Sequence, residues 1–339
     1  MSRPIFTLSK LAGGAQAALP ILMYHRVLPT HDPLQAETHT ARTMDTQFRT
    51  LARWFKVLPL DEAAALLAEG RLPPRAVSIT FDDGYRDNHD IALPLLQRHG
   101  LTATFYVSSG FLNGGTMFHD VMVETIRHAP TGRLDLGLPD AGPVTLGDVP
   151  SRILALDTLV RQVKYLDPDQ REALSERLLA TLGAHAPRHL MMDDEQVRAL
   201  TRAGMSVGGH TTQHLILARL DEATAWEEIR SNADALSSLT GQRLTSFAYP
   251  NGKPGLDYNP PHVEMVRRAG FLNAVSTRSG VGTRGAPRFE LPRFVLNETT
   301  TAGILMRMLR MTASAATSSS STSKTCKGVG SLIDRKSVV

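Results

Sequence analysis

Residues 77–90, VSITFDDGYRDNHD, place two adjacent aspartates directly after a short apolar run. The run shows no alternation of polar and apolar residues, so it predicts a strand over residues 76–81 that is buried on both faces. Asp82 and Asp83 would then lie where this strand ends. Strand interiors disfavour aspartate and adjacent carboxylates repel each other, so the pair needs a chemical reason.

Similar apolar runs recur along the chain, and helical patterns separate them. One such pattern covers residues 220–241, where apolar residues recur at three- and four-residue steps and Gly241 marks the end. Strands that alternate with helices predict a parallel sheet, and eight short strands fit a closed or nearly closed barrel. The other predicted strands are 20–27, 56–60, 102–108, 205–210, 244–250, 273–277 and 291–296.

One stretch breaks this alternation. No strand is predicted between Gly110 and Asp194, whereas residues 151–166 and 168–183 carry apolar residues at helical spacing. A helical insertion of this size is more than a connector. The favoured interpretation is a solvated subdomain packed on the side of the barrel; the alternatives are a lid and an oligomer contact.

Composition limits the classes of function. The 339 residues are 42% hydrophobic and 21% charged, with a net charge of +4, which allows a full-sized core. Lysine and arginine are scattered without a basic block, so nucleic acid is not an expected partner. Cys326 is the only cysteine, so any transition-metal site must use His, Asp or Glu.

No run approaches the length of a membrane span. The first residues lack a compact apolar segment behind a basic head, so we expect a cytoplasmic protein. After about residue 312 the sequence becomes rich in serine and threonine, which predicts disorder over 312–339.

A second unusual stretch, MSVGGHTTQHLIL at 205–217, has histidines four residues apart after a predicted strand. Residues i and i+4 of a helical turn point the same way, so His210 and His214 can reach one ion. Asp83, from another strand end, would complete a His-His-Asp set with positions open for water and substrate. Asp82 would then be free to act as a base on a metal-bound water. Asp-Asp-Gly is also a common turn, but finding both motifs after buried strands of one chain favours a site.

The segments TFDDG at 80–84 and HTTQH at 210–214 resemble the first two motifs of the polysaccharide deacetylases, the NodB-homology or carbohydrate esterase family 4 group. FAYPNG at 247–252 resembles the third motif, and the resemblance spans roughly residues 20–300. It implies a distorted (β/α)7 barrel over 18–311, with the helical insertion at about 112–193. It also implies hydrolysis of an N-acetyl group on an amino sugar that depends on a divalent metal ion.

Carried over to this chain, the resemblance makes Asp82 the general base. Asp83, His210 and His214 become the metal ligands, and we expect zinc as the ion. The implied partner is an N-acetylated glycan, a polysaccharide or an oligosaccharide, whereas the oligomeric state is left open. Two alternatives remain: a non-catalytic carbohydrate-binding relative, and a hydrolase of a small cyclic amide.

The chain departs from the family at two positions. Many members have an arginine in the third motif that orients the base, where this chain has Ala248, and the late Leu-x-His motif that supplies the proton donor is absent. His25, at the end of the first predicted strand, could be the acid, or equally a core histidine bonded to a backbone carbonyl. Arg293, at another strand end, could hold Asp82, or be a plain surface arginine.

Three further expectations concern the loops. Tyr249 and Asn251 could contact a sugar, although residues of a YPNG turn need no such role. Five further histidines are expected to be solvated or to cap helices rather than to be ligands: His89, His99, His119, His128 and His262.

Overall fold

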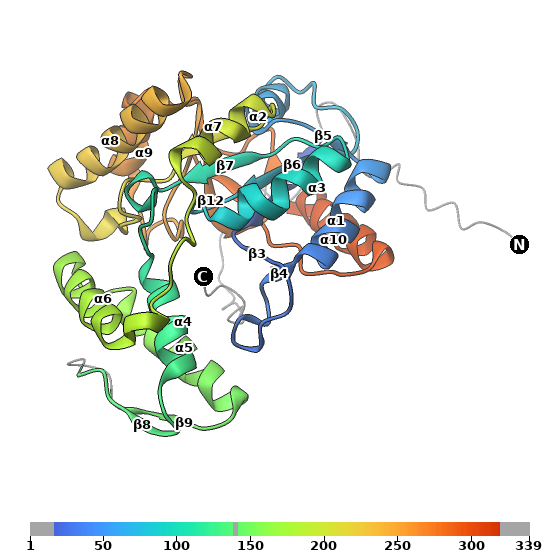
Figure 1. Ribbon diagram of the computed structural model, residues 1–339. Helices are drawn as coiled ribbons and strands as arrows, with labels where there is room; N and C mark the ends of the chain where they lie inside the picture. The colour runs from blue at the N-terminus through green and yellow to red at the C-terminus, as the bar shows by residue number, and fades with distance from the viewer. Residues whose placement is uncertain (1–16, 138–141, 319–339) are drawn as a thin grey trace, which may run out of the picture.

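The computed structural model describes residues 17–137 and 142–318 of the chain. A ring of parallel strands forms its centre (Figure 1). The ring closes because the Met23 N–H donates to the Phe294 carbonyl (3.1 Å) and the Phe294 N–H donates to the Ile21 carbonyl (3.1 Å). The predicted distorted (β/α)7 barrel is therefore confirmed. In ring order the strands are β2 (Ile21–Tyr24), β6 (Ala76–Phe81), β7 (Thr104–Val107), β10 (Ser206–Gly209), β11 (Ser246–Ala248), β12 (Asn273–Ser279) and β14 (Leu291–Arg293).

The strand expected at 56–60 lies outside this ring. β5 (Lys56–Val57) pairs only with the first two residues of β6, Ala76 and Val77. The rest of β6 pairs with β2, which leaves β5 no place in the ring. Two further short pairs lie beside the barrel: antiparallel β1 (Ala18–Leu19) with β13 (Gly282–Thr283), and parallel β3 (Val27–Leu28) with β4 (His39–Thr40).

Helices cover the outside of the ring, and their ends follow local chemistry. The side chain of Asp221 accepts the Thr224 N–H (2.9 Å) before α8 begins, and Gly241 ends this helix in the left-handed conformation. Apolar side chains of the strands and helices form the main core, where Phe81, Phe105 and Phe247 are fully buried. The helices are α1 (Ala41–Trp54), α2 (Leu60–Ala68), α3 (Leu93–Arg98), α7 (Asp194–Arg202), α8 (Glu222–Thr240), α9 (Pro260–Arg268) and α10 (Thr301–Ser318).

The predicted start of the tail is wrong, because α10 continues through residue 312 to Ser318. Residues 319–339, with Cys326, lie outside the described part of the chain. No helix among the described residues is long and apolar enough to cross a membrane.

The insertion is a separate group of elements that Figure 1 shows in green beside the barrel. It has its own apolar core, distinct from the core of the barrel. Its helices are α4 (Phe118–His128), α5 (Val149–Val163) and α6 (Pro168–Leu182). An antiparallel hairpin, β8 (Gly132–Leu134) with β9 (Val144–Leu146), was not predicted, because its strands of three residues are largely exposed or half-buried and contain no apolar run.

Candidate active site

The polar residues singled out in the sequence lie at one end of the barrel. Asp82 follows β6, His210 follows β10, and Arg293 ends β14. Parallel strands of a ring all have their carboxyl ends on the same face, which is where barrel enzymes carry their active sites. The barrel therefore brings these side chains together.

Asp83, His210 and His214 form the one cluster with metal-ligand character among the described residues. Their ligand atoms lie within 4.8 Å of one another. The Nε2 atoms of His210 and His214 lie 3.3 and 3.4 Å from Asp83 Oδ1. That oxygen is buried and has no hydrogen-bond partner, as expected of an atom whose partner is an ion.

A hydrogen bond sets the orientation of the first histidine. Nδ1 of His210 lies 2.7 Å from the carbonyl oxygen of Ala248, so this nitrogen carries the proton and donates it. In the neutral ring the lone pair is then on Nε2, next to Asp83, which is the tautomer that metal-bound histidines have. Burial lowers the pKa of His210, but the hydrogen bond and charge of Asp83 outweigh burial and raise this pKa, so a bound ion would take the place of a proton on Nε2. Burial lowers the pKa of His214 to about 3, so this ring is neutral and able to ligate. The donor set therefore fits a divalent ion.

The histidines are not on a helical turn, as the sequence pattern had suggested. The loop after β10 has positive φ angles at Thr211 (58°) and His214 (52°), and these bends bring the two rings to a centroid distance of 4.9 Å. Asp83 also has a positive φ (80°). Such backbone conformations cost free energy and are concentrated at functional sites.

A buried asparagine supports this loop and was missed in the sequence. Asn232 Oδ1 accepts the backbone N–H of His210 (2.9 Å), and its Nδ2 donates to the Val107 carbonyl (3.0 Å). Asn232 lies in the middle of α8 and is fully buried. An isolated asparagine in a helix carries no sequence signal for this role.

Asp82 forms a buried ion pair with Arg293. Nη1 of Arg293 lies 2.6 Å from Oδ1 of Asp82, and Nη2 lies 2.6 Å from Oδ2. Burial alone would raise the pKa of Asp82, but the guanidinium opposes this effect and holds that pKa below its ordinary value. Arg293 is 0% exposed, so the alternative of a surface arginine is wrong. Asp82 is thus an oriented, ionised carboxylate.

His25 also lies near this carboxylate. Its Nε2 is 3.9 Å from Asp82 Oδ2, and its side chain keeps 20% of its surface exposed. Within the described residues its ring donates to no backbone carbonyl, unlike His39, which bonds to the Leu296 carbonyl (2.7 Å). The His25 carbonyl accepts a hydrogen bond from Asn88 (2.7 Å), which fixes the backbone at this point. His25 therefore lines the cavity beside Asp82 and is not a core histidine bonded to a backbone carbonyl.

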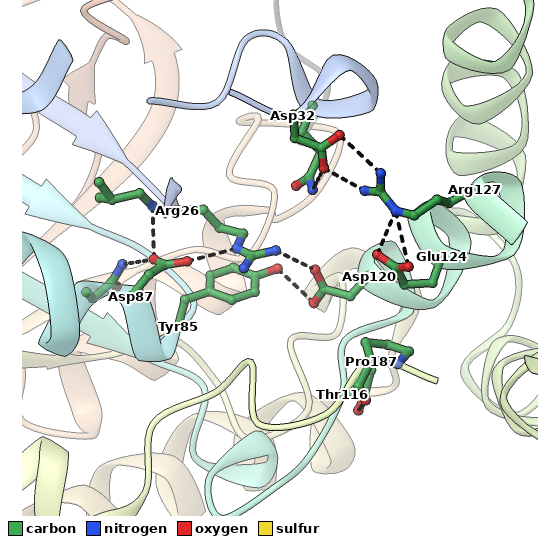
Figure 2. A network of polar contacts seen from close by, with 12 residues as sticks. Arg26, Asp32, Tyr85, Asp87, Thr116, Asp120, Glu124, Arg127 and Pro187 are labelled. Carbon is green, nitrogen blue, oxygen red and sulfur yellow. Dashed lines mark hydrogen bonds and ion pairs between the residues drawn. The ribbon is translucent and has the colours of Figure 1, made fainter. Parts of the chain in front are cut away.

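A polar network next to His25 joins the barrel to α4 of the insertion (Figure 2). Nε of Arg26 donates to Asp87 (3.0 Å), and Nη1 donates to Asp120 on α4 (3.4 Å). The Tyr85 hydroxyl donates to the same Asp120 carboxylate (3.2 Å). Burial raises the pKa of Asp120 to about 7, although Arg26 opposes this effect. Figure 2 also shows Arg127 of α4 bound to Asp32 of the barrel, with Nη2 2.5 Å from Oδ2.

His119, next to Asp120 on α4, differs from expectation. It lines the same cavity as Asp82 and Asp83 instead of being a solvated or capping residue. Its Nδ1 is buried without a hydrogen-bond partner, and burial lowers the pKa of its ring to about 4. The sequence could not reveal this, because the chain path of the insertion decides which of its histidines face the barrel.

The cavity has a volume of about 520 Å³, and Asp82, Asp83, His210 and His214 all line it. Asn251 also lines it, as its predicted contact with a sugar requires. Tyr249 does not, because its ring is fully buried and stacked on Tyr258 at a centroid distance of 3.7 Å, so its predicted role is wrong. Residues of α5 form one wall, so the insertion is part of the site and not merely packed on the barrel side.

Comparison with known proteins agrees with this geometry. A sequence profile of the polysaccharide deacetylase family matches residues 69–130 and 175–274, which contain both aspartates and both histidines. The chain belongs to the polysaccharide deacetylase family. The unmatched segment 131–174 contains the hairpin and α5, so this wall of the cavity is not part of the shared family pattern.

Individual polysaccharide deacetylases are distant from this chain. The YxkH protein of Bacillus subtilis is 22% identical over 283 residues, which are 82% of this chain and 71% of YxkH. Poly-beta-1,6-N-acetyl-D-glucosamine N-deacetylase of Staphylococcus epidermidis is 24% identical over 213 residues, 55% of this chain and 70% of that enzyme. The deacetylase PplD of Streptococcus pyogenes, solved with acetate, has the same fold, with a TM-score of 0.58 and 18% identity over 86% of this chain and 98% of PplD.

Proposed function

We propose that the protein hydrolyses N-acetyl groups of an N-acetylglucosamine polysaccharide or oligosaccharide, with zinc held by Asp83, His210 and His214. One observation carries this proposal. An open set of three ligand side chains lies at the carboxyl end of the barrel, beside an ionised carboxylate that a buried arginine orients. The name of the Staphylococcus epidermidis relative supports N-acetylglucosamine as the sugar.

A bound divalent ion would polarise the acetyl carbonyl and make a water molecule acidic enough to attack at neutral pH. Asp82 then takes the proton from the attacking water. Its bidentate pair with Arg293 fixes the direction of its oxygens and keeps it ionised, which a general base requires. Asp82 and Asp83 thus have different tasks, although they are neighbours in the chain.

His25 supplies the proton that the departing nitrogen needs. An amide nitrogen leaves poorly as an anion, so it must be protonated as the C–N bond breaks. His25 Nε2 lies 3.9 Å from Asp82, and His25 lines the cavity in which the amide of a bound N-acetyl sugar would lie. His25 therefore replaces the histidine of the late motif that this chain lacks.

Release of acetate from short N-acetylglucosamine oligomers tests the proposal. We expect release from the zinc-loaded protein, loss of release after chelation, and recovery when zinc is added back. Manganese and cobalt added in parallel test the identity of the ion. If metal binds with a defined stoichiometry but no oligomer releases acetate, the proposal is wrong, and the two alternatives, a non-catalytic carbohydrate-binding relative and a hydrolase of a small cyclic amide, remain.

A further inference from the structure

The wall that α5 contributes to the cavity is a single helical face. Its cavity-lining residues recur at three- and four-residue steps, so one side of the whole helix borders the site. The first half of this face is apolar, and Leu154 is 67% exposed within it. The second half ends with a cation. In chain order the face includes Ile153, Leu154, Asp157, Val160, Arg161 and Lys164.

Two lysines line the cavity at the cationic end of this face. Lys164 directly follows α5, and Lys253 lies in the loop after β11; both line the cavity. Among the described residues the only other lysine is Lys56 on β5. The remaining side chains with a permanent positive charge in this part of the chain are arginines. Both cavity lysines are half-buried, and neither forms an ion pair with a described side chain.

Two acidic groups lie at this end, and neither forms an ion pair with Lys164 or Lys253; Oδ1 of Asp257 is buried without a hydrogen-bond partner. Asp157 forms an ion pair with Arg161 on the same helix. Asp257, which attracts Lys164 electrostatically, is buried and accepts the backbone N–H of Lys253 through Oδ2 (2.9 Å). Burial lowers the pKa of Lys164; the charge of Asp257 opposes this effect, and the positive charge of Lys253 adds to it by a smaller amount. Half-buried ammonium groups that repel each other are stabilised when an anion binds between them.

We propose that the glycan bound by this site carries an anionic group, a carboxylate or a phosphate ester, and that this group binds between Lys164 and Lys253. The inference rests on the proposed function, since it concerns the substrate of the same cavity. Lysine is a compact charge with rotatable donors and binds either anion without the planar match that arginine requires. The sugar ring that carries the anion would lie against the apolar half of the α5 face. Because α5 lies outside the matched family profile, this preference would be a property of this chain.

The test compares kcat/KM for acetate release from three probes. They are a neutral N-acetylglucosamine oligomer, a hyaluronan oligosaccharide that carries carboxylates, and an N-acetylglucosamine oligomer that carries a phosphate ester. We expect at least one anionic probe to exceed the neutral probe by about tenfold, the effect of one hydrogen bond to a charged group. The preference should decline with added sodium chloride. The anionic probe that shows the preference identifies the anion as a carboxylate or a phosphate ester.

Variants assign the effect to the lysine pair. Lys164→Met and Lys253→Met should each remove most of the preference, whereas Lys56→Met, on an exposed strand, should keep it. Lys164 also lies at the C-terminal end of α5, where a cation stabilises the helix dipole. Thermal unfolding distinguishes this stabilising role from anion binding. If Lys164 only stabilised the helix, its replacement would change the melting temperature and leave the ratio of kcat/KM between charged and neutral probes unchanged. That result, or equal kcat/KM for charged and neutral probes in the parent protein, would overturn the proposal.

The two proposals can fail separately. Acetate release from all probes at equal efficiency keeps the deacetylase function and removes the anion subsite. If no probe releases acetate, calorimetry can still measure the binding of the same probes and so test the anion subsite. Tighter binding of an anionic probe that depends on both lysines would support it, and equal binding would overturn it.

Discussion

The floor of the cavity and its α5 wall are held in place by different kinds of contact. On the floor, Asp82 and Arg293 belong to ends of different ring strands and are almost fully buried. The strands that carry them are fixed on both sides by hydrogen bonds of the closed ring. The position of the base is therefore coupled to the core of the barrel.

The wall belongs to an insertion with a core of its own. Its α4 helix meets the barrel through polar pairs of two kinds: Arg127–Asp32, whose side chains are 31% and 18% exposed, and Arg26–Asp120, whose side chains are 15% and 2% exposed. Partly exposed ion pairs contribute about 0–1 kcal/mol each, whereas breaking a buried pair costs about 3–5 kcal/mol. The base is thus held by the strands of the closed ring, whereas the wall is joined to the barrel through side-chain contacts of α4, some partly exposed and some buried.

The largest loss of activity is expected from replacing the predicted metal ligands on the floor of the cavity. His210→Ala or His214→Ala should remove the bound metal and abolish acetate release, because the remaining two ligands do not hold a divalent ion firmly. Elemental analysis and the acetate assay measure both effects. His99→Ala, which removes a histidine bound to Asp45 outside the site, is the matched control and should keep both. Parent-like metal content in the site variants would refute the ligand assignment.

His25→Ala should retain the fold and the metal but reduce turnover by about 10²–10⁴-fold, the usual effect of a general acid. The acid must be protonated to act, so activity of the parent should fall at high pH, and the variant should lose this limb of the pH–rate profile. Near-parent activity would show that His25 is structural and would leave Asp82 to return the proton itself.

Arg293→Met should destabilise the protein by about 3–5 kcal/mol, because Asp82 would remain buried without its partner. Arg293 lowers the pKa of Asp82, so its loss should raise that pKa and move the acidic limb of the pH–rate profile to higher pH. Chemical unfolding and pH–rate measurements check the two effects, with the exposed pair Arg230–Asp234 as control through Arg230→Met. If the acidic limb of the pH–rate profile does not move, Arg293 does not control the pKa of the base.

The smallest effect is expected at the wall. Arg127→Ala should reduce the free energy of unfolding by about 1 kcal/mol or less, as for other partly exposed pairs. If the pair also orients α5, KM for a glycan should rise while kcat stays near that of the parent. A fall in kcat with unchanged KM would mean that the insertion acts on the chemistry and that floor and wall are not independent.

The sequence revealed the floor better than the wall for a physical reason. Each buried strand appears in the sequence as a short apolar run, and the polar residues that follow it lie at its carboxyl end. This local pattern places Asp82, Asp83, His210 and even Arg293 on one face of the barrel. His119, Asn232 and the α5 wall depend on how distant segments pack, and no local pattern records that. Tyr249 was misassigned because its neighbour Asn251 faces the cavity while Tyr249 points into the core.

The most direct test of the account is the metal content and turnover of two neighbouring variants, Asp82→Asn and Asp83→Asn. Both remove one negative charge from adjacent positions of the same loop, so each is the control for the other. We expect Asp82→Asn to bind one equivalent of metal and to lose acetate release, because the ligands remain and the base does not. Asp83→Asn should instead bind metal more weakly, with part of its activity restored at higher metal concentration. Equal loss of metal in both variants would contradict the division of tasks between the two aspartates.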